Sequence, residues 1–309
     1  MYRDIVVVGS AVYDITGRFQ HAGATAGDSN PGDIYSSCGG VGRNIAENAA
    51  RIGLASSLIS AWGQDIFAAE LSASCNDALV DTSHVFASAK IKTSVYIDLL
   101  DHRGELVIAA ADLTSLESVP AGTFSYRMDF INQHKLVCLD ANLVESQLAV
   151  LAKGCTRPIM ADTVSAAKAT RLSRILPNIH TLKTNVAELC ALTGRDSADR
   201  KGIEKAAGEL LNAGVQRVFV TLGRHGACCL DRRGVMWQDG FKADVVSVTG
   251  AGDAFAAGIA YSILRELNVR DTLLFATAMA HLALAAPNAV NRDISKAKAL
   301  RLAAEFGMP

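Results

Sequence analysis

The 309-residue sequence lacks the features by which several classes of protein are first recognised. No apolar run is long enough to span a bilayer, and the first one, residues 5–8, is too short for the core of a signal peptide. The formal net charge is −1, so no basic excess favours nucleic acid or a membrane surface as a partner. We therefore expect a cytosolic protein.

Metal-binding and disulfide motifs are absent as well. The seven cysteines are an odd number and form no Cys-x-x-Cys pair, and the seven histidines show no His-Glu-x-x-His or similar spacing. Cys138, Cys228 and Cys229 lie in apolar, strand-like runs. We expect buried, reduced thiols rather than ligands or cross-links.

Two common nucleotide-binding fingerprints are also missing. Gly9-Ser10-Ala11 follows the first apolar run but does not fit Gly-x-Gly-x-x-Gly, and no Gly-Lys-Ser/Thr completes a Walker motif. A Rossmann-type dinucleotide site therefore has little support. The remaining composition, 50% hydrophobic and 20% charged, is that of an ordinary globular protein with a large core.

Short apolar runs alternate with helix-like segments along the whole chain. The predicted strands are residues 5–8, 57–61, 135–140, 158–162, 180–183 and 217–222, and the predicted helices between them are residues 44–52, 145–153, 166–176, 186–193 and 201–213. Strands that are apolar throughout are typical of a sheet covered on both faces. The alternation predicts an α/β fold with a doubly wound, mostly parallel sheet flanked by helices. We expect residues 1–309 to form a single domain.

Two segments interrupt this alternation. Residues 12–38 hold glycines, small polar residues and two strand-like pieces, and residues 93–100 and 105–111 read as a hairpin turned at Asp101-His102-Arg103-Gly104. These inserts, at about 12–38 and 93–111, are predicted to pair as a small antiparallel β lid over a site. The alternative is a peripheral hairpin with no role.

The stretch most informative about chemistry is Val245-Val246-Ser247-Val248-Thr249-Gly250-Ala251-Gly252-Asp253-Ala254-Phe255-Ala256-Ala257-Gly258. It predicts a strand end, a tight turn and a helix start. Glycines let a ligand approach the backbone, and the first amides of a helix can hold an anion. Asp253 has no bulky neighbour in sequence to bury it, and at a helix N-terminus we expect it to be ionised. The alternative is an N-cap after an ordinary turn.

A second glycine-rich turn, Cys38-Gly39-Gly40-Val41-Gly42-Arg43-Asn44, leads into another predicted helix near the N-terminus. Asn44 opens that helix with an amide that can both donate and accept hydrogen bonds. Asp14 lies just past the first strand, where the carboxyl ends of parallel strands face a ligand crevice. Its carboxylate suits two neighbouring sugar hydroxyls, although a simple turn residue is the alternative.

Two further strand-to-helix or strand-to-turn junctions occur at Thr184-Asn185-Val186-Ala187-Glu188 and Thr221-Leu222-Gly223-Arg224-His225-Gly226. Asn185 and Glu188 fit an N-cap and its capping box, or else a pair near a phosphate-bound Mg²⁺ that they contact through water. The second junction either borders a nucleotide or is a tight loop.

In this order the motifs resemble those of the ribokinase-like (PfkB-type) family of carbohydrate and nucleoside kinases, over essentially the whole chain. Residues 39–53 are similar to the family's first signature and residues 249–253 to its second, while residues 185–188 and 221–226 resemble its Asn-x-x-Glu and Thr-x-Gly-x-x-Gly motifs. Three details are most similar to members that phosphorylate pseudouridine: Asp28-Ser29-Asn30-Pro31-Gly32, Gly39-Gly40-Val41-Gly42-Arg43-Asn44 and Val248.

The resemblance implies ATP-dependent phosphorylation of a hydroxymethyl group, here the 5′-hydroxyl of a ribosyl substrate. Asp253 would accept the hydroxyl proton, and the amides of Gly250, Ala251, Gly252 and Asp253 would receive the charge that grows on the transferred phosphoryl group.

The same resemblance assigns the binding residues. The substrate would be held by Asp14, Gly40, Asn44 and Asn142, and covered from the lid by Thr93, Ser94 and Tyr96. The nucleotide would lie against Asn185, Thr221, Gly223, Gly226 and Thr249. Asn185 and Glu188 would lie near Mg²⁺.

One position departs from the family. Many relatives carry Asp near a monovalent cation where this chain has Ser247, and a hydroxyl is a poorer K⁺ ligand than a carboxylate, which weakens the case for activation by K⁺. Relatives often form homodimers through the lid. The apolar side chains of residues 93–111 suit either such a dimer or packing onto the chain's own domain.

Several alternatives stay open at this point. The chain resembles kinases of ribose, a ketohexose, uridine or adenosine in the same motifs, and a nucleoside-binding protein without catalytic activity could share the fold. The intact Gly250-Ala251-Gly252-Asp253 favours an enzyme.

Overall fold

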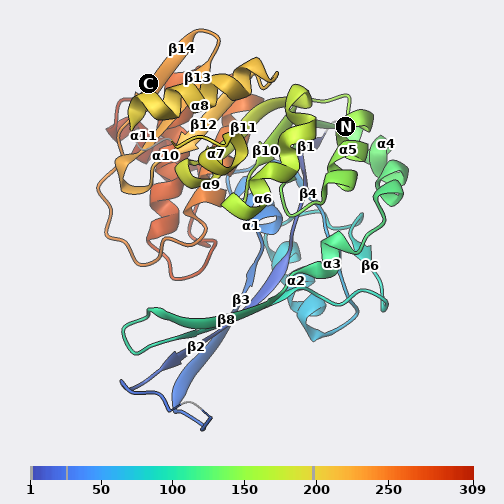
Figure 1. Ribbon diagram of the computed structural model, residues 1–309, viewed down its shortest axis with the longest axis vertical. Coiled ribbons are helices and arrows are strands. Elements are labelled where there is room, and N and C mark those ends of the chain that lie inside the picture. The colour runs from blue at the N-terminus through green and yellow to red at the C-terminus, as the bar shows by residue number, and fades with distance from the viewer. Residues whose placement is uncertain (1–2, 26, 197–198) are drawn as a thin grey trace.

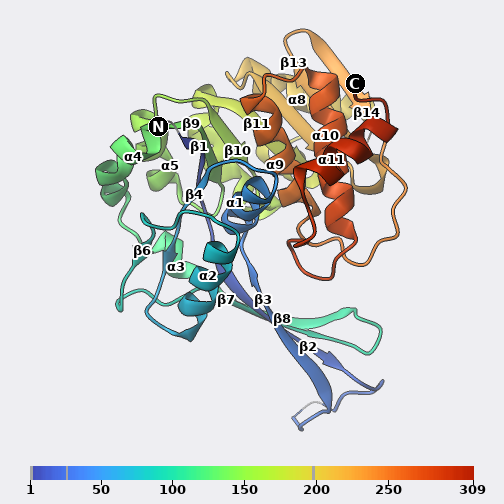
Figure 2. The ribbon, with the colours of Figure 1, turned by 180° about the vertical axis from the view of Figure 1, so that it is seen from behind.

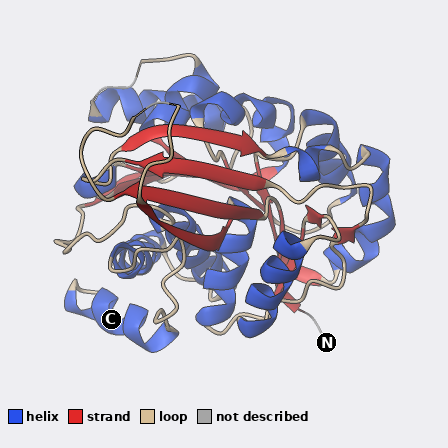
Figure 3. Cartoon of the chain, turned by 90° about the horizontal axis from the view of Figure 1, so that it is seen from below, coloured by secondary structure: helices blue, strands red, loops and turns tan. Residues whose placement is uncertain are grey.

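An eight-stranded sheet runs through the centre of the molecule in the order β14-β13-β12-β11-β10-β9-β1-β4 (Figures 1 and 3). The computed structural model describes residues 3–25, 27–196 and 199–309. In this order all neighbouring strands between β12 and β4 pair in parallel, whereas β13 pairs antiparallel with both β12 and β14. The strands are β1 (Arg3–Val8), β4 (Ser56–Ile59), β9 (His134–Asp140), β10 (Ile159–Asp162), β11 (Ile179–Asn185), β12 (Arg217–Thr221), β13 (Ala227–Asp231) and β14 (Gly234–Gln238).

Helices cover both faces of this sheet, as the apolar strands predict (Figure 3). Successive residues of β1 show the division, because Ile5 and Val7 join one buried cluster while Val6 and Val8 join the other. On the first side lie α1 (Val41–Arg51), α2 (Ile66–Asp77), α9 (Ala251–Leu264), α10 (Val269–Leu284) and α11 (Lys296–Glu305). On the second lie α3 (Thr114–Glu117), α4 (Met128–Asn132), α5 (Glu145–Gly154), α7 (Val186–Thr193) and α8 (Arg200–Asn212).

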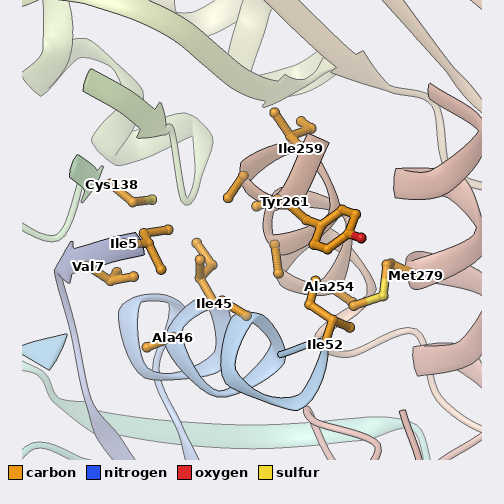
Figure 4. Packing of buried hydrophobic residues seen from close by; sticks show 14 of the residues in the cluster. Ile5, Val7, Ile45, Ala46, Ile52, Cys138, Ala254, Ile259, Tyr261 and Met279 are labelled. Carbon is orange, nitrogen blue, oxygen red and sulfur yellow. The ribbon is translucent and has the colours of Figure 1, made fainter. Parts of the chain in front are cut away.

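Helices α1 and α9, which follow the two glycine-rich turns, pack against each other (Figure 4). Ala46 and Ala49 of α1, and Ala254 and Ala257 of α9, are fully buried. Alanines at this contact allow the two helices to approach closely, so the turns at their N-termini lie side by side. The packing of the core thus places two segments far apart in sequence at one edge of the sheet.

The two inserts form a second sheet that projects from the body (Figures 1 and 2). It has the order β3-β2-β7-β8, with β2 (Val12–Phe19), β3 (Gly32–Gly39), β7 (Val95–Leu100) and β8 (Leu106–Asp112). Both predicted hairpins are antiparallel, β2 with β3 and β7 with β8, and a parallel pair of β2 with β7 joins them. We call this sheet the lid.

Some local predictions were wrong. Residues 245–248 form no strand, because the amides of Val246 and Ser247 donate to the carbonyl of Leu284 at the end of α10 instead of to a strand. The predicted helix 166–176 is α-helical only in α6 (Ala166–Ala169) and continues as the 3₁₀ segment Thr170–Asn178, where Pro177 has no amide for an α-helix. The predicted strand 57–61 is divided between β4 and β5 (Ala61–Trp62), which pairs with β6 (Phe86–Ala87).

Two other 3₁₀ segments, Ala121–Arg127 and Gly223–His225, complete the regular structure. Within the described ranges, no helix combines the length and the apolar character required to cross a bilayer.

Candidate active site

The two glycine-rich turns meet in a single hydrogen bond. The amide Nδ2 of Asn44, near the start of α1, donates to Oδ2 of Asp253, near the start of α9, at 2.7 Å. Both side chains are buried. Two residues that sequence reasoning placed on opposite sides of one site are therefore in direct contact.

Arg43 holds the first turn in shape. Its guanidinium donates to the carbonyls of Gly39 (3.0 Å) and Cys38 (2.6 Å) and forms an ion pair with Glu47. It also donates to Oδ1 of Asn44 at 2.5 Å, which leaves Nδ2 of that amide to donate to Asp253. Sequence reasoning missed this role. The sequence did offer one signal for it, because Arg43 directly follows a turn that contains three glycines.

The turn before α9 requires glycine. Gly250 is the N-cap with a φ of 80°, and a Cβ there would overlap the carbonyl oxygen of Ala289. Within the described residues the amides of Gly250 and Gly252 donate no hydrogen bond, whereas that of Asp253 donates to the carbonyl of Gly250. A Cβ on Gly252 would lie 3.0 Å from Nζ of Lys183. Free amides and an ammonium group thus converge at the start of this helix, an arrangement suited to an anion.

Asp253 does not have the ordinary acidity that its sequence neighbours suggested. Only 9% of the residue is exposed, because α1 and the sheet edge cover it. The pKa of Asp253 is raised to about 7. Burial is the largest cause and the nearby charge of Asp162 adds to it, while Lys183 and the hydrogen bond from Asn44 lower the pKa. The prediction of a fully ionised carboxylate was therefore wrong. A carboxyl with a pKa near neutrality is better matched to proton transfer.

A row of charged residues lies at the carboxyl ends of three neighbouring strands. Asp140 of β9, Asp162 of β10 and Lys183 of β11 are aligned by the strand register. Lys183 forms an ion pair with Asp162 at 3.0 Å. Burial alone would lower the pKa of Lys183, but the charges of Asp162, Glu188 and Asp253 raise it to about 12. Lys183 therefore stays cationic beside Gly252.

The predicted ribosyl-side residues lie on two elements. Asp14 is on β2, and its carboxylate packs directly against Gly39. Gly39 therefore has no room for a Cβ. Burial raises the pKa of Asp14 to about 7, with Arg43 lowering it and Asp98 raising it. Gly40 caps α1 with a φ of 90°. The structure places Gly40 directly beside the Asn44–Asp253 contact, because the carbonyl of Gly40 accepts from the amide of Asn44.

Asn142 belongs to a buried network after β9. Its Nδ2 donates to Oγ of Ser10 at 2.9 Å, and its Oδ1 accepts from Nζ of Lys168 at 2.6 Å. The amide of Ser10 donates to Asp140 at 2.8 Å. Ser10 and Lys168 were not predicted, because they come from distant parts of the chain.

The three residues predicted to cover the substrate separate in the structure. Tyr96 lies on β7, but Thr93 and Ser94 precede that strand and are buried at the base of the lid. The hydroxyl of Thr93 donates to Asp65 at 2.7 Å, and that of Ser94 bonds Ser115 at 2.7 Å. Because both hydroxyls have partners within the protein, these two residues position the lid, and Tyr96 is the one of the three on a lid strand.

A cavity of about 400 Å³ lies on the other side of the α9 turn. Four of the predicted nucleotide residues line it, together with Lys183 and Gly252: Asn185, Thr221, Gly223 and Gly226. The fifth, Thr249, lies in the exposed turn between two lining residues, Val248 and Ala251. The cavity is also lined by four apolar residues that sequence reasoning did not assign to a site: Phe241, Val245, Ala280 and Leu284. The volume and the mixture of apolar and polar lining residues suit a small-molecule site.

Asn185 and Glu188 form a capping box. Oδ1 of Asn185 accepts from the amide of Glu188 at 2.9 Å, and Oε2 of Glu188 accepts from the amide of Asn185 at 3.0 Å. Oε1 of Glu188 accepts from Nδ2 of Asn185 at 2.7 Å. Among the residues whose positions are described, no group of three or more His, Cys, Asp or Glu is arranged to hold a metal ion. These two side chains therefore suit a metal contact through water rather than direct coordination.

Comparison with known proteins agrees with this architecture. Residues 3–296 match the model of the pfkB family carbohydrate kinases. The pseudouridine kinase of Escherichia coli K12 is 33% identical over 300 residues, which cover 96% of each chain.

Solved structures give the same result. A carbohydrate kinase from Agrobacterium tumefaciens has a TM-score of 0.85 with 28% identity, covering 98% of this chain and 97% of that one. Arabidopsis thaliana ribokinase, solved with ribose and ATP, has a TM-score of 0.90 with 23% identity, covering 98% and 99%. From the family match and the extent of these similarities, the chain belongs to the pfkB family of carbohydrate kinases and is a phosphotransferase that acts on a hydroxyl group of a sugar or nucleoside.

Proposed function

We propose that this protein phosphorylates the 5′-hydroxyl of a ribosyl nucleoside with ATP, and that pseudouridine is its substrate. The observation that carries the reaction is the buried Asp253, whose pKa is about 7, held by Asn44 beside the free amides of Gly250 and Gly252. The choice of pseudouridine is supported by 33% identity to a pseudouridine kinase over 96% of both chains.

In this mechanism Asp253 accepts the proton of the attacking hydroxyl. Its raised pKa makes it a stronger base than an ordinary aspartate, and the bond from Asn44 fixes the direction in which its carboxylate points. Positioning contributes most of the rate, because phosphoryl transfer passes through a loose transition state.

The backbone before α9 receives charge as the phosphoryl group moves. The amides of Gly250 and Gly252 donate to its oxygens, and Lys183 adds a fixed positive charge beside Gly252. One such donor typically contributes about 3–4 kcal/mol to the transition state. Asp14 accepts from two neighbouring ribosyl hydroxyls, and Gly40 borders them. Asn142, whose Oδ1 accepts from Lys168 and whose Nδ2 donates one hydrogen to Ser10, keeps its second N–H for a hydroxyl.

ATP, when bound, supplies the phosphoryl group, and Mg²⁺ neutralises part of the triphosphate charge. The residues present fit these groups: among the residues that line the cavity, Lys183, Thr221 and Gly223 would face the phosphates, and Phe241, Val245 and Leu284 would offer an apolar surface to the base. Asn185 and Glu188 would contact the metal through water, since their side-chain oxygens already accept hydrogen bonds within the capping box. Thr249 borders the phosphates from the turn.

K⁺ is not required in this proposal. The hydroxyl of Ser247 accepts from the amide of Thr249 at 3.2 Å, so it already has a donor and carries no charge to attract a cation. Turnover measured with K⁺ replaced by Na⁺ at constant ionic strength should be unchanged.

We also propose that two copies of the chain associate through the lid. Ile34, Ile97 and Ile108 are exposed on one face of the lid, the face opposite to Asp14, according to the strand register. Their exposure supports association with a second copy over packing onto the chain's own domain. Exposed apolar side chains on one sheet face suit a second copy.

A panel of acceptors tests the proposed substrate. Pseudouridine, uridine, adenosine, ribose and fructose are each supplied with ATP, and ADP and the phosphorylated product are quantified. We expect the highest kcat/KM for pseudouridine and a 5′-phosphate as product. Equal or faster turnover of ribose or fructose would contradict the assignment, and thermal stabilisation by a nucleoside without any turnover would indicate a binding protein.

A further inference from the structure

Asp98 is an acidic residue on the lid that none of the roles above uses. It lies on β7, two residues after Tyr96. In the parallel pairing of β2 with β7, Asp14 is opposite Tyr96 and Thr16 is opposite Asp98. Side chains of aligned residues share a face, and the face repeats every second residue. Asp14, Tyr96 and Asp98 therefore lie on one face of the lid.

This face is the one that looks toward the catalytic residues. On the opposite face the ring of Tyr13 packs against Phe67 of α2, with ring centroids 5.0 Å apart, so the body covers that side at the base of the lid. Asp14, on the face of Asp98, is close enough to Arg43 of the first glycine turn for that charge to lower the pKa of Asp14. Arg43 in turn bonds Asn44, the partner of Asp253.

One oxygen of Asp98 lacks a partner. Oδ1 is shielded from solvent and accepts no hydrogen bond among the described residues. The charge of Asp98 raises the pKa of Asp14, and no ion pair of Asp98 with a cation is found among the described residues. A shielded acceptor without a donor is uncommon in a folded protein and calls for an explanation. The simplest one is a donor that arrives with the substrate.

The distance along the strand fits a nucleoside base. Two residues of β7 span about 6.6 Å, which is the scale of a pyrimidine ring. With Asp14 on the ribosyl hydroxyls, as in the proposed function, the base extends from the ribose along the lid, past Tyr96 toward Asp98. Tyr96 then offers its ring to the base and Asp98 offers an acceptor to its edge.

The chemistry of the base supplies the missing donor. Pseudouridine is joined to ribose through carbon, so its N1 keeps a hydrogen. When the glycosidic bonds of pseudouridine and uridine are superimposed, that N1–H falls where uridine has C5–H. An acceptor at this place can bind the first nucleoside and is left unpaired by the second.

We propose that Asp98 is a specificity-determining residue that accepts a hydrogen bond from N1–H of pseudouridine and thereby excludes uridine. This inference rests on the proposed function. A site that hydrogen-bonds one substrate group rejects the analogue that lacks it far more strongly than an apolar pocket rejects a change of size.

The test combines changes in the enzyme with changes in the substrate. Wild type, Asp98→Ala and Asp98→Asn are assayed with pseudouridine, uridine, N1-methylpseudouridine and ribose, and kcat/KM is measured for each pair. Asp33→Asn is the matched control, because Asp33 lies on the same lid face, opposite Arg18 and farther from the body. The thermal midpoint of each variant confirms that it is folded.

We expect wild type to prefer pseudouridine to uridine and to N1-methylpseudouridine. Asp98→Ala should lower kcat/KM for pseudouridine by about 10- to 100-fold and leave the values for the two analogues and ribose nearly unchanged, so that the preference collapses. Asp98→Asn keeps one acceptor oxygen and should recover part of the loss. Asp33→Asn should preserve the full preference.

The two proposals fail in different ways. Wild type could prefer pseudouridine while Asp98→Ala lowers the turnover of pseudouridine and uridine equally, or lowers neither. In that case Asp98 does not accept a hydrogen bond from N1–H, and only the inference about Asp98 is overturned. If wild type phosphorylates ribose or another sugar but not pseudouridine, the proposed function is wrong and the inference is overturned with it.

Discussion

The edge of the parallel sheet and the lid differ in how their polar groups are satisfied. At the sheet edge Asp162 pairs with Lys183, Asp140 accepts from Ser10, and Asp253 accepts from Asn44, all of them buried. On the lid β8 is exposed along its whole length, and Asp14 and Asp98 form no ion pair with any residue that the structure describes. The carboxylates of the sheet edge thus each have a partner within the protein before substrate arrives, whereas Oδ1 of Asp98 has none among the described residues.

This difference separates catalysis from recognition. A preorganised, buried set of charges acts on any hydroxyl that reaches it, so changes there should lower kcat for every acceptor. Lid groups that lack partners gain them from one particular substrate, so changes there should alter the choice among acceptors.

The largest effect should come from Asp253→Asn. The substitution keeps the shape and an acceptor for Asn44 but removes the base, so kcat should fall by about 10²- to 10⁴-fold for all acceptors alike. ATP binding, measured by calorimetry, should persist. Asp271→Asn is the matched control, since Asp271 is also buried and occupies the same third position, in α10. Near-normal turnover of Asp253→Asn would remove Asp253 from the role of base.

Gly250→Ala should come next. The added Cβ overlaps the carbonyl of Ala289 and the residue must keep a φ of 80°, so the turn has to move. Displacing its amides should lower kcat by about 10²- to 10³-fold and destabilise the fold. Gly104→Ala at the tip of the lid is the control, because its φ is 89° but nothing lies within 4 Å of the added Cβ. That variant should lose only about 1–2 kcal/mol of stability and keep its turnover.

The region around Gly250 also shows how much of the structure could be predicted from the sequence. The turn, the following helix and the residues Asn44 and Asp253 were predictable, because glycine spacing and helix starts are local patterns. The central strands were predictable to within a few residues, since a continuous apolar run needs cover on both faces. The strand predicted at 245–248 failed for a tertiary reason: those amides bond the end of α10, which no local pattern contains.

The parts of the site that were missed also depend on tertiary structure. Asp140 and Asp162 each end a strand and Lys183 lies two residues before the end of another, but only the register between strands puts the three in one row. The acidity of Asp253 was mispredicted because its burial comes from α1 and from neighbouring strands, not from its own neighbours in sequence. Thr93 and Ser94 were placed on the lid because the hairpin boundary was two residues too early.

The dependence of activity on pH should reflect one carboxyl in each region, Asp253 at the sheet edge and Asp14 on the lid. Because burial raises the pKa of Asp253 and of Asp14 to about 7, both carboxyls gain protons as the pH falls below 7, and neither can then accept. kcat/KM should fall by between tenfold and a hundredfold per pH unit below 7. In Asp14→Asn the slope should be reduced to tenfold. An unchanged steep slope would mean that Asp14 does not titrate in this range.

Stability should change with pH in the opposite direction. Between about pH 4 and pH 7 the folded protein keeps a proton on Asp253 that the unfolded chain has released, so the contribution of Asp253 to the free energy of unfolding decreases as the pH rises. Asp253→Asn, which does not titrate, should gain in thermal midpoint over wild type across this interval and keep a constant advantage above it. If the thermal midpoints of wild type and Asp253→Asn changed by the same amount with pH over this interval, the raised pKa of Asp253 would be contradicted.

The smallest effect on catalysis should follow a change on the outer face of the lid. Ile108 is 61% exposed on the face away from Asp14, and Ile108→Lys should convert a dimer to a monomer, measured by sedimentation, with kcat unchanged. Asp33→Lys is the matched control, since Asp33 is exposed on the other face of the lid and its substitution should leave the dimer intact. A wild type that is monomeric at micromolar concentration would show that these side chains are not an interface. A dimer whose dissociation lowers kcat would instead show that the lid contributes to catalysis as well as to recognition, and the division drawn above would not hold.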